Sequence, residues 1–322
     1  MNNHLNFSMM KLIQALTPLL FTTGLLFANL EKELQTQFIL AASGDTITIP
    51  KGHHKIQGTL SIEGKENLVI QGVGMDVSIL SFSNQSEGAQ GISITNSKNI
   101  TLEKFTIQDS KGDAIKAQYT DGIIFRHVKV EWTGGPKETN GAYGLYPVQC
   151  ENVLIEHSIS IGASDAGIYV GQSNNIVVRY NEAFENVAGI EIENSYNAEV
   201  YENYSHGNTG GILVFDLPDL IQKQGGNVRV YNNRIESNNL FNFAPKGNIV
   251  GKVLPGTGIM ILACSGVHIF GNTIRNNKSI GTGIVSYFMT EEAIKDSLYN
   301  PYTADIHIYN NVYDRWPGFP EL

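Results

Sequence analysis

The chain contains little cysteine and few charged side chains. Only two of its 322 residues are Cys, and Asp, Glu, Lys and Arg together make up 16%. Two Cys exclude a disulfide-rich scaffold and the repeated Cys patterns of structural zinc sites. Basic residues are fewer than acidic ones, 22 against 31, and the formal net charge is −9. This excludes nucleic acid as the expected partner, because nucleic-acid binding depends on clustered Lys and Arg. It also argues against a polyanionic sugar, unless a cation such as Ca²⁺ intervenes.

Long apolar runs are scarce, and the longest lies at the amino terminus. Lys11 precedes an apolar run from Leu12 to Leu26, and Ala28 is a suitable last residue before a cleavage site. This arrangement is typical of a secretory signal peptide, and the run is short for a membrane span. No Cys follows it to carry a lipid. We therefore predict a signal peptide at residues 1–28, a periplasmic or secreted protein, and no membrane anchor after the signal is removed.

One pattern recurs eight times: a small residue, a branched apolar residue, and then alternating apolar and surface residues. The eight pairs are Gly91-Ile92, Ala114-Ile115, Gly144-Leu145, Gly167-Ile168, Gly189-Ile190, Gly211-Ile212, Gly258-Ile259 and Gly283-Ile284. Where nothing is inserted, consecutive pairs lie 22 or 23 residues apart. Such a repeat with strand-like alternation is typical of a solenoid. It predicts an all-β fold, a single-stranded right-handed parallel β-helix over residues 29–322, with eight regular rungs after an irregular N-terminal portion.

Apolar residues at positions 30, 34, 38 and 41 have helical spacing, so a short helix over residues 30–42 is expected to cap the open end of the stack. Insertions are expected after Ile212 and Ile284 in one turn of the rung, and at residues 132–142 and 239–255 in the other. The two Cys fall in one column, four rungs apart. At about 4.8 Å per rung they are roughly 19 Å apart and cannot pair.

Like residues are expected to stack between rungs. Five residues into the second strand of five rungs stands Asn: Asn181, Asn203, Asn233, Asn272 and Asn311. A second column alternates charge and then becomes aromatic: Glu103, Arg126, Glu156, Arg179, Tyr201, Tyr231, Phe270 and Tyr309. We interpret both columns as structural, because amide ladders and alternating charges satisfy neighbouring strands.

Candidate functional residues lie on the outward face of the first strands, one, three or four positions after the Ile or Leu. Glu191 and Glu193 share one strand face, with carboxylates on the order of 6–7 Å apart, a spacing that suits acid–base work on a sugar. With Asp216 on the next rung, the same carboxylates are an alternative Ca²⁺ site, although no metal ligands are assigned. Lys116 is a candidate base if its pKa is lowered. We name Glu191, Glu193, Asp216 and Lys116 as candidate catalytic residues.

Polar and aromatic side chains beside them are candidate ligand-binding residues. Tyr146 and Tyr169, one rung apart, can offer a platform for a sugar ring or a phenolic proton. Asp165 precedes a first strand at a corner, where Asp also commonly caps a turn. The candidate ligand-binding residues are Tyr146, Tyr169, Gln149, Gln172, Asn194 and Asp165.

Several strings resemble the secreted parallel β-helix repeat-containing proteins. They are residues 110–116 (SKGDAIK), 140–148 (NGAYGLYPV), 162–173 (GASDAGIYVGQS), 186–195 (NVAGIEIENS) and 208–218 (NTGGILVFDLP). The resemblance covers roughly residues 40–315 and implies an exported β-helix, often encoded beside a second exported protein. More distantly, the chain is similar to carbohydrate-binding and sugar-hydrolase β-helices and to mannuronan C5-epimerases. The Asp-Pro-His-Asp string of those epimerases is absent from this sequence.

Two functions follow. The first is an exported protein that binds a polysaccharide or oligosaccharide on the outward face of its first sheet; whether it also cleaves or epimerises it, as a hydrolase, lyase or epimerase, stays open. The alternative is a non-enzymatic scaffold that docks a second exported protein. Its docking surface would be the apolar part of the same face, Leu213, Phe215, Met260 and Leu262.

Overall fold

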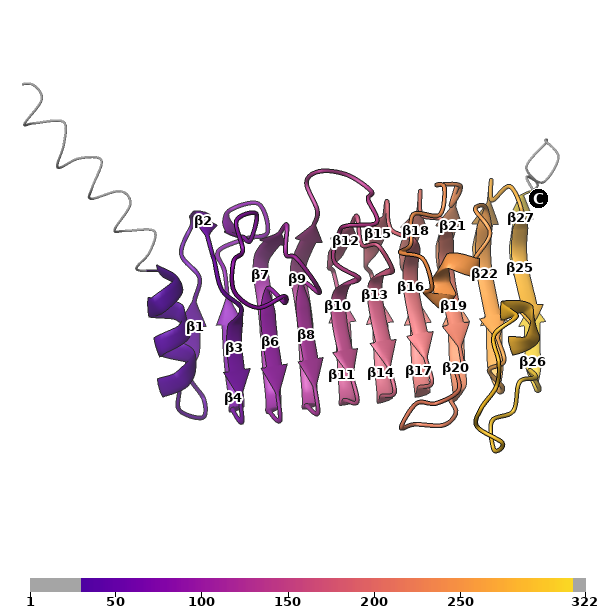
Figure 1. The fold of residues 1–322 in the computed structure, drawn as a ribbon, viewed down its shortest axis with the longest axis horizontal. Helices are drawn as coiled ribbons and strands as arrows, with labels where there is room; N and C mark the ends of the chain where they lie inside the picture. Colours follow the sequence, from indigo (N-terminus) through magenta and orange to yellow (C-terminus); the bar gives the residue numbers. More distant parts are fainter. Residues whose placement is uncertain (1–29, 315–322) are drawn as a thin grey trace, which may run out of the picture.

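A computed structural model describes residues 30–314; the predicted signal peptide lies outside the described residues. The chain winds into a parallel β-helix whose strands stack along one long axis (Figure 1). Within residues 30–314, no helix is long and apolar enough to cross a membrane.

The first sheet of the described chain has nine strands, one from each successive rung. They are β3 (Leu60–Glu63), β6 (Ile92–Thr95), β8 (Ile115–Gln118), β10 (Tyr143–Val148), β13 (Ala166–Gly171), β16 (Ala188–Glu193), β19 (Gly210–Phe215), β22 (Thr257–Leu262) and β25 (Ile280–Val285). The register confirms the repeat: Ile92, Ile115, Leu145, Ile168, Ile190, Ile212 and Ile259 pair in turn and are fully buried. This stacked column of aliphatic side chains runs through the hydrophobic core.

The remaining strands form two further rows, which β7 (Lys98–Gln108) and β9 (Asp121–Glu131) join because each is long enough to pair in both. The second row also contains β1 (Thr46–Thr48), β4 (Glu66–Gln71), β11 (Glu151–Glu156), β14 (Asn174–Arg179), β17 (Tyr196–Tyr201), β20 (Gly226–Tyr231), β23 (Val267–Phe270) and β26 (Ile306–Tyr309). The third also contains β2 (Gly52–Lys55), β5 (Ser78–Ser81), β12 (Ile159–Ile161), β15 (Glu182–Phe184), β18 (Tyr204–His206), β21 (Arg234–Glu236), β24 (Thr273–Arg275) and β27 (Val312–Asp314).

The sequence alignment of the last rung was wrong by two residues. Ile259 pairs with Thr282, and Ile284 pairs with Ile261 instead. Thr282 lies 23 residues after Ile259, so the period itself marks this register. The sequence alignment chose Gly283-Ile284 because this pair also has a small residue followed by a branched one. It lies two positions after the pair that holds the register.

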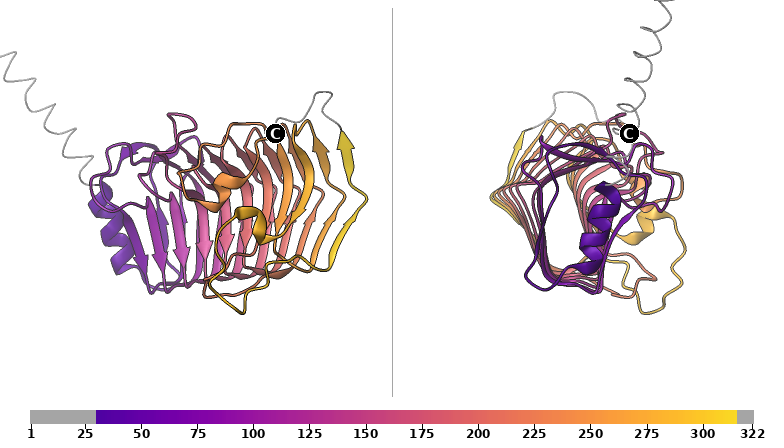
Figure 2. Two further views of the ribbon diagram at one scale, coloured as in Figure 1. Left: turned by 45° about the vertical axis from the view of Figure 1, so that its right-hand side comes forward. Right: turned by 90° about the vertical axis from the view of Figure 1, so that its left-hand side faces the viewer.

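The first rung is capped as expected. Residues 30–40 are helical, and Leu34 and Phe38 turn into the end of the core with 1% of their surface exposed. The helix crosses the open end of the stack, as the end-on view in Figure 2 shows. It therefore lies over the edges of the first-rung strands, which would otherwise offer unpaired backbone groups to another chain.

The predicted ladders are confirmed. Asn181, Asn203, Asn233, Asn272 and Asn311 pass amide hydrogen bonds of 2.9–3.0 Å from rung to rung. A second ladder that the sequence analysis did not identify runs through Asn186, Asn208, Asn238 and Asn277. In the charged column, Glu156 accepts bonds from Arg126 and Arg179 at 2.6 Å, and Tyr201, Tyr231, Phe270 and Tyr309 stack at 4.9–5.0 Å. Both Cys are free and buried, as predicted.

Three insertions lie over the C-terminal half of the first sheet, and we call them the covering loops. They are residues 216–225 between β19 and β20, residues 237–256 between β21 and β22, and residues 286–305 between β25 and β26. The second contains the 3₁₀ turn η1 (Ile249–Lys252) and the third contains η2 (Tyr287–Thr290). Figure 2 shows both turns beside one face of the stack.

Candidate functional site

The outward columns of the first sheet fall where the alternation predicted. Tyr146 pairs with Lys116 on one neighbouring rung, and Tyr169, Glu191, Leu213 and Met260 follow one another across β13, β16, β19 and β22. Glu193 and Phe215 occupy the second column on adjacent strands. The repeat therefore brings residues from six rungs onto one face.

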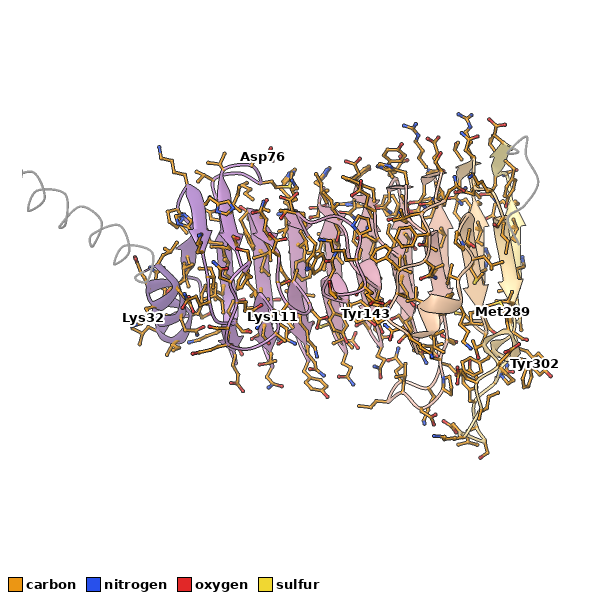
Figure 3. The ribbon with its side chains drawn as sticks, turned by 45° about the horizontal axis from the view of Figure 1, so that its top comes forward. Lys32, Asp76, Lys111, Tyr143, Met289 and Tyr302 are labelled. Atoms are coloured by element: carbon orange, nitrogen blue, oxygen red, sulfur yellow. The ribbon has the colours of Figure 1, made fainter. Side chains whose placement is uncertain are left out.

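The covering loops bury much of this face. Glu191 is 3% exposed and Glu193 is 8% exposed, so neither carboxyl lies on an open surface. The loops pack on the sheet through an apolar cluster with Leu213 and Met260, to which they contribute Phe243, Val250, Val253, Tyr287 and Tyr299. Figure 3 shows Met289 and Tyr302 on the third covering loop, toward the C-terminal end from Tyr143.

The surface expected to dock a protein partner is therefore closed. Leu213, Phe215, Met260 and Leu262 are all 0–1% exposed beneath the loops. The covering loops occupy the apolar surface that a protein partner was expected to contact. The scaffold hypothesis therefore no longer has an exposed docking surface in these four residues.

Three tyrosines mark the border between the open and the covered parts of the face. Tyr146 and Tyr169 meet edge to face, with centroids 5.0 Å apart and planes at 82°. Tyr143 contacts both rings, at 4.5 and 4.4 Å. The two predicted tyrosines thus do not form a flat platform. Tyr143 and Tyr146 are half-buried, whereas Tyr169 is 4% exposed.

Behind the tyrosines lies a cluster of three buried acids, Asp165, Glu191 and Glu193. The Tyr169 hydroxyl donates a 2.6 Å hydrogen bond to Glu193 Oε1. Asn248, in the second covering loop, donates a 3.0 Å bond to Asp165 Oδ2. Glu191 Oε2 is buried without a hydrogen-bond partner among the described residues. An ionised carboxylate would be costly in such a place.

The pKa values of the three acids reflect that cost. Burial, and then the charge of Glu193, raise the pKa of Asp165 to about 7. Burial also raises the pKa of Glu193 to about 7, against the hydrogen bond from Tyr169 and with the charge of Asp216. The pKa of Glu191 rises well above its ordinary value, through burial and then the charges of Asp165 and Glu193. Asp165 and Glu193 can therefore hold and release protons near neutral pH, a property that acid–base catalysts also have.

Asp216 has hydrogen-bond partners different from those of these acids, although its charge acts on Glu193. Its Oδ2 accepts a 3.0 Å hydrogen bond from the Gly225 backbone, and its carbonyl accepts a 2.5 Å bond from the Tyr299 hydroxyl. Burial raises its pKa to about 6. Asp216 thus ties two covering loops to the sheet, while its Oδ1 is buried without a partner among the described residues.

The expected alternative of a Ca²⁺ site gains no support from the geometry. Among residues 30–314, no group of three or more His, Cys, Asp or Glu side chains is arranged to hold a metal ion. Glu191 and Glu193 face the tyrosines and Asp165, whereas Asp216 is engaged by Gly225.

Lys116 lies at the open side of the border. Its ammonium is 5.3 Å from the centre of the Tyr146 ring, and its charge also acts on Asp113. Burial raises the pKa of Asp113, and Lys116 opposes that rise. Beside them, Gln118 donates a 2.7 Å hydrogen bond to Gln149 Oε1, and both amides are half-buried.

Gln172 and Asn194 are engaged with the first covering loop. Gln172 Oε1 accepts bonds from the backbone of Ile221 and Gln222 at 3.0 and 3.2 Å. Asn194 donates to the carbonyls of Leu217 and Gln222 at 2.9 and 3.0 Å. In this structure both side chains hold the loop in place, Gln172 through its amide oxygen and Asn194 through its amide nitrogen.

Sequence reasoning did not identify Tyr143 or Asn248. Tyr143 begins β10 at a corner, where strict alternation does not tell which way a side chain points. Asn248 reaches Asp165 from a loop 83 positions later in the chain, and no local pattern indicates that contact.

Comparisons with known proteins agree with the fold. Residues 90–239 match the family model described as the right handed beta helix region. No curated protein matches the sequence. Among solved structures, the chain is similar to the A-module of the mannuronan C-5 epimerase AlgE6 from Azotobacter vinelandii, at 14% identity and a TM-score of 0.53, over 90% of this chain and 94% of that one. It is also similar to a hyperthermoactive exopolygalacturonase from Thermotoga maritima, at 12% identity and a TM-score of 0.50, over 89% and 87%.

These likenesses establish the fold. The chain is a right-handed parallel β-helix protein, the class that the 22-residue repeat predicted.

Proposed function

We propose that the chain binds a carbohydrate on the outward face of its first sheet and that Asp165 and Glu193 exchange protons with it. The observation that carries the proposal is the Tyr169–Glu193 hydrogen bond within a buried acid cluster in which the pKa values of Asp165 and Glu193 rise to about 7. Polysaccharide-acting enzymes among the similar structures support the same class of ligand.

The half of the face that the loops leave uncovered carries polar side chains that suit a sugar. Ser93, Thr95, Lys116 and Gln118 are half-buried on β6 and β8, and they lead to the half-buried Tyr146. Hydroxyl, amide and ammonium groups suit sugar hydroxyls, and the tyrosine rings suit the apolar face of a sugar. The covering loops close the face beyond Tyr169, so the sugar would lie against Tyr143 and Tyr146. Protons would pass between it and the buried acids through the hydroxyls of Tyr169 and Tyr143, which contact Glu193 and Asp165.

The three acids have different roles in this proposal. Glu193, held by Tyr169, and Asp165, held by Asn248, form a pair from which one member donates a proton while the other accepts one. Glu191 is the least exposed of the three acids, and burial with the charges of Asp165 and Glu193 keeps it protonated. Lys116 orients the sugar at the entrance. This acid–base chemistry serves cleavage or epimerisation alike.

The test is a calorimetric and thermal-shift screen of the protein against neutral, anionic and cationic glycans, each with and without Ca²⁺. We expect a neutral glycan, or an anionic one with Ca²⁺, to raise the melting temperature. Turnover should be lost in Glu193→Gln and retained in Glu151→Gln, which changes an exposed carboxylate on β11. No response to any glycan would overturn the proposal.

We also propose that the protein resides in the periplasm or outside the cell, on the basis of the signal-like residues 1–28. Cell fractionation with amino-terminal sequencing tests this. A mature chain that begins near residue 29 supports export, whereas an intact Met1 in the cytoplasm contradicts it.

A further inference from the structure

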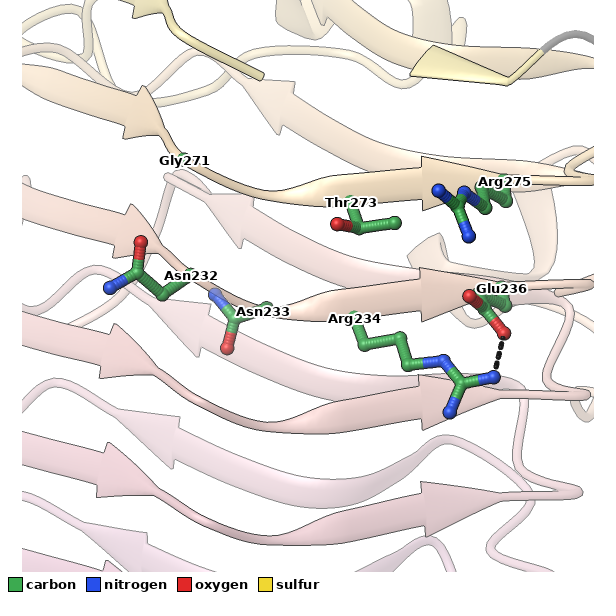
Figure 4. Close-up of a pocket in the computed structure, with 7 residues that line it drawn as sticks. All are labelled: Asn232, Asn233, Arg234, Glu236, Gly271, Thr273 and Arg275. Carbon is green, nitrogen blue, oxygen red and sulfur yellow. Dashed lines mark ion pairs between the residues drawn. The ribbon is translucent and has the colours of Figure 1, made fainter. Parts of the chain in front are cut away.

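A second polar depression lies on the third row of strands, away from the acid cluster. It measures about 390 Å³ and is lined by Asn232, Asn233, Arg234, Glu236, Gly271, Thr273 and Arg275. Figure 4 shows these residues on β21 and β24 and in the turns that lead into the two strands. Its residues belong to none of the columns described for the first sheet.

The depression follows from the register of these two strands. Arg234 pairs with Thr273, and Glu236 pairs with Arg275, so the two long arginines stand on a diagonal. The short Thr273 leaves space between them. At the corner, Gly271 has no side chain, and a Cβ there would lie 2.4 Å from Asn232 Oδ1. The hollow is therefore a consequence of two small residues beside two large ones.

The side chains that line the depression carry a net positive charge, whereas the whole chain is negatively charged. Two guanidinium groups and one carboxylate line it, whereas the chain carries a formal net charge of −9. The guanidinium of Arg234 is already engaged within the protein, because it forms an ion pair with Glu236 at 2.7 Å and lies 4.4 Å from the centre of the Tyr204 ring. Arg275 has only a distant ion pair with Asp314, at 4.0 Å, and its side chain is 47% exposed. Most of its five donors can therefore face a ligand.

Beside the depression is a stacked aromatic strip. Tyr204 lies 4.0 Å from His206, and His206 lies 5.0 Å from Phe184 on the preceding rung. Arg234 continues this strip toward the depression by its contact with Tyr204. Planar groups followed by amide, hydroxyl and guanidinium donors suit a ring that carries both hydroxyls and an anionic group.

We propose that this depression binds a carboxylated sugar, with Arg275 taking the carboxylate and with Asn232, Thr273 and Glu236 taking the hydroxyls. The site would add a second contact for a glycan that the first sheet binds, and in that sense it extends the proposed function. The depression itself does not depend on the acid cluster. Because the depression is shallow, we expect weak binding, with a dissociation constant of about 1 mM.

The experiment measures binding of galacturonate, galactose, acetate and inorganic phosphate by NMR titration of the whole protein. We expect galacturonate to bind best, about tenfold more weakly in Arg275→Gln, and with unchanged affinity in Arg229→Gln. Arg229 is the matched control, because it is an exposed arginine on β20 that pairs with Glu199 outside the depression. Thr273→Tyr is a second variant that keeps both arginines and fills the space, and it should abolish binding.

Equal binding of galactose, acetate or phosphate would overturn the proposal, as would equal loss in Arg229→Gln or no binding at 20-fold above the expected constant. Glu193→Gln separates the two proposals. It should leave galacturonate binding at this depression unchanged, even if all turnover on the first sheet is lost.

Discussion

Asn248, in a covering loop, donates a hydrogen bond of 3.0 Å to Asp165, which lies 83 positions earlier at a corner of the β-helix. This bond joins an insertion to the acid cluster, and it favours the ionised form of Asp165. The loop and the protonation of the cluster are therefore linked.

Removing that bond should loosen the loop. For Asn248→Ala we expect faster hydrogen exchange across residues 237–256 and a loss of about 1 kcal/mol in the free energy of unfolding. Lys246→Ala, an exposed change in the same loop, is the control. Unchanged exchange in the Asn248 variant would show that apolar packing alone holds the loop.

Stability should fall as pH rises from about 4 to about 7. The folded-state pKa values of Asp165 and Glu193 are raised to about 7, above ordinary values of 3.8 and 4.5. Between these limits the folded state binds more protons than the unfolded state, so raising the pH favours unfolding. Glu193 alone contributes on the order of 3 kcal/mol over this window. Chemical denaturation of wild type and Glu193→Gln at pH 4, 5, 6, 7 and 8 measures it. A variant that keeps the full wild-type slope would contradict this assignment.

The asparagine ladder from Asn181 to Asn311 should be sensitive to a single substitution. Asn203 accepts bonds from the backbone and side chain of Asn181, and it donates to Asn233 and to the Val178 carbonyl. Asn203→Ala leaves several buried groups unpaired, and we expect a loss of about 3 kcal/mol. Asn174→Ala, which removes an exposed bond to Glu151, should change stability by less than about 0.5 kcal/mol. Equal effects in urea unfolding would show that the ladder adds nothing beyond a surface bond.

Leu213 should matter for folding and not for association. It is fully buried beneath the covering loops, so Leu213→Ala should cost about 3 kcal/mol through lost contacts and a cavity. Leu298→Ala, at an 83% exposed position in the third covering loop, should be near neutral. Thermal unfolding measures both. If Leu213→Ala left stability intact but abolished binding to a co-purifying protein, the docking alternative would return.

The fold could be predicted from the sequence because each rung repeats the same physical requirement. Ile168, Ile190 and Ile212 fill equivalent positions in the core, and equal spacing reveals them. The error at the last rung has the same source, since Gly283-Ile284 copies the pattern where Gly281-Thr282 holds the register.

The candidate site could be predicted only in part. Alternation placed Tyr169, Glu191 and Glu193 on one outward face, as the structure does. It gave no measure of burial, which depends on how far the insertions fold back. For that reason the sequence could not show that Gln172 and Asn194 bond to residues 216–225, or that Asn248 meets Asp165.

The stacking of rungs also has a mechanical consequence. Hydrogen bonds between rungs run along the long axis, so tension applied at the two chain ends would peel the stack from an end, rung by rung. Each rung released between residues 145 and 212 frees 22 or 23 residues, roughly 75 Å of extended chain. Such a molecule should lengthen in even steps under force, with a larger step where the 237–256 insertion is released.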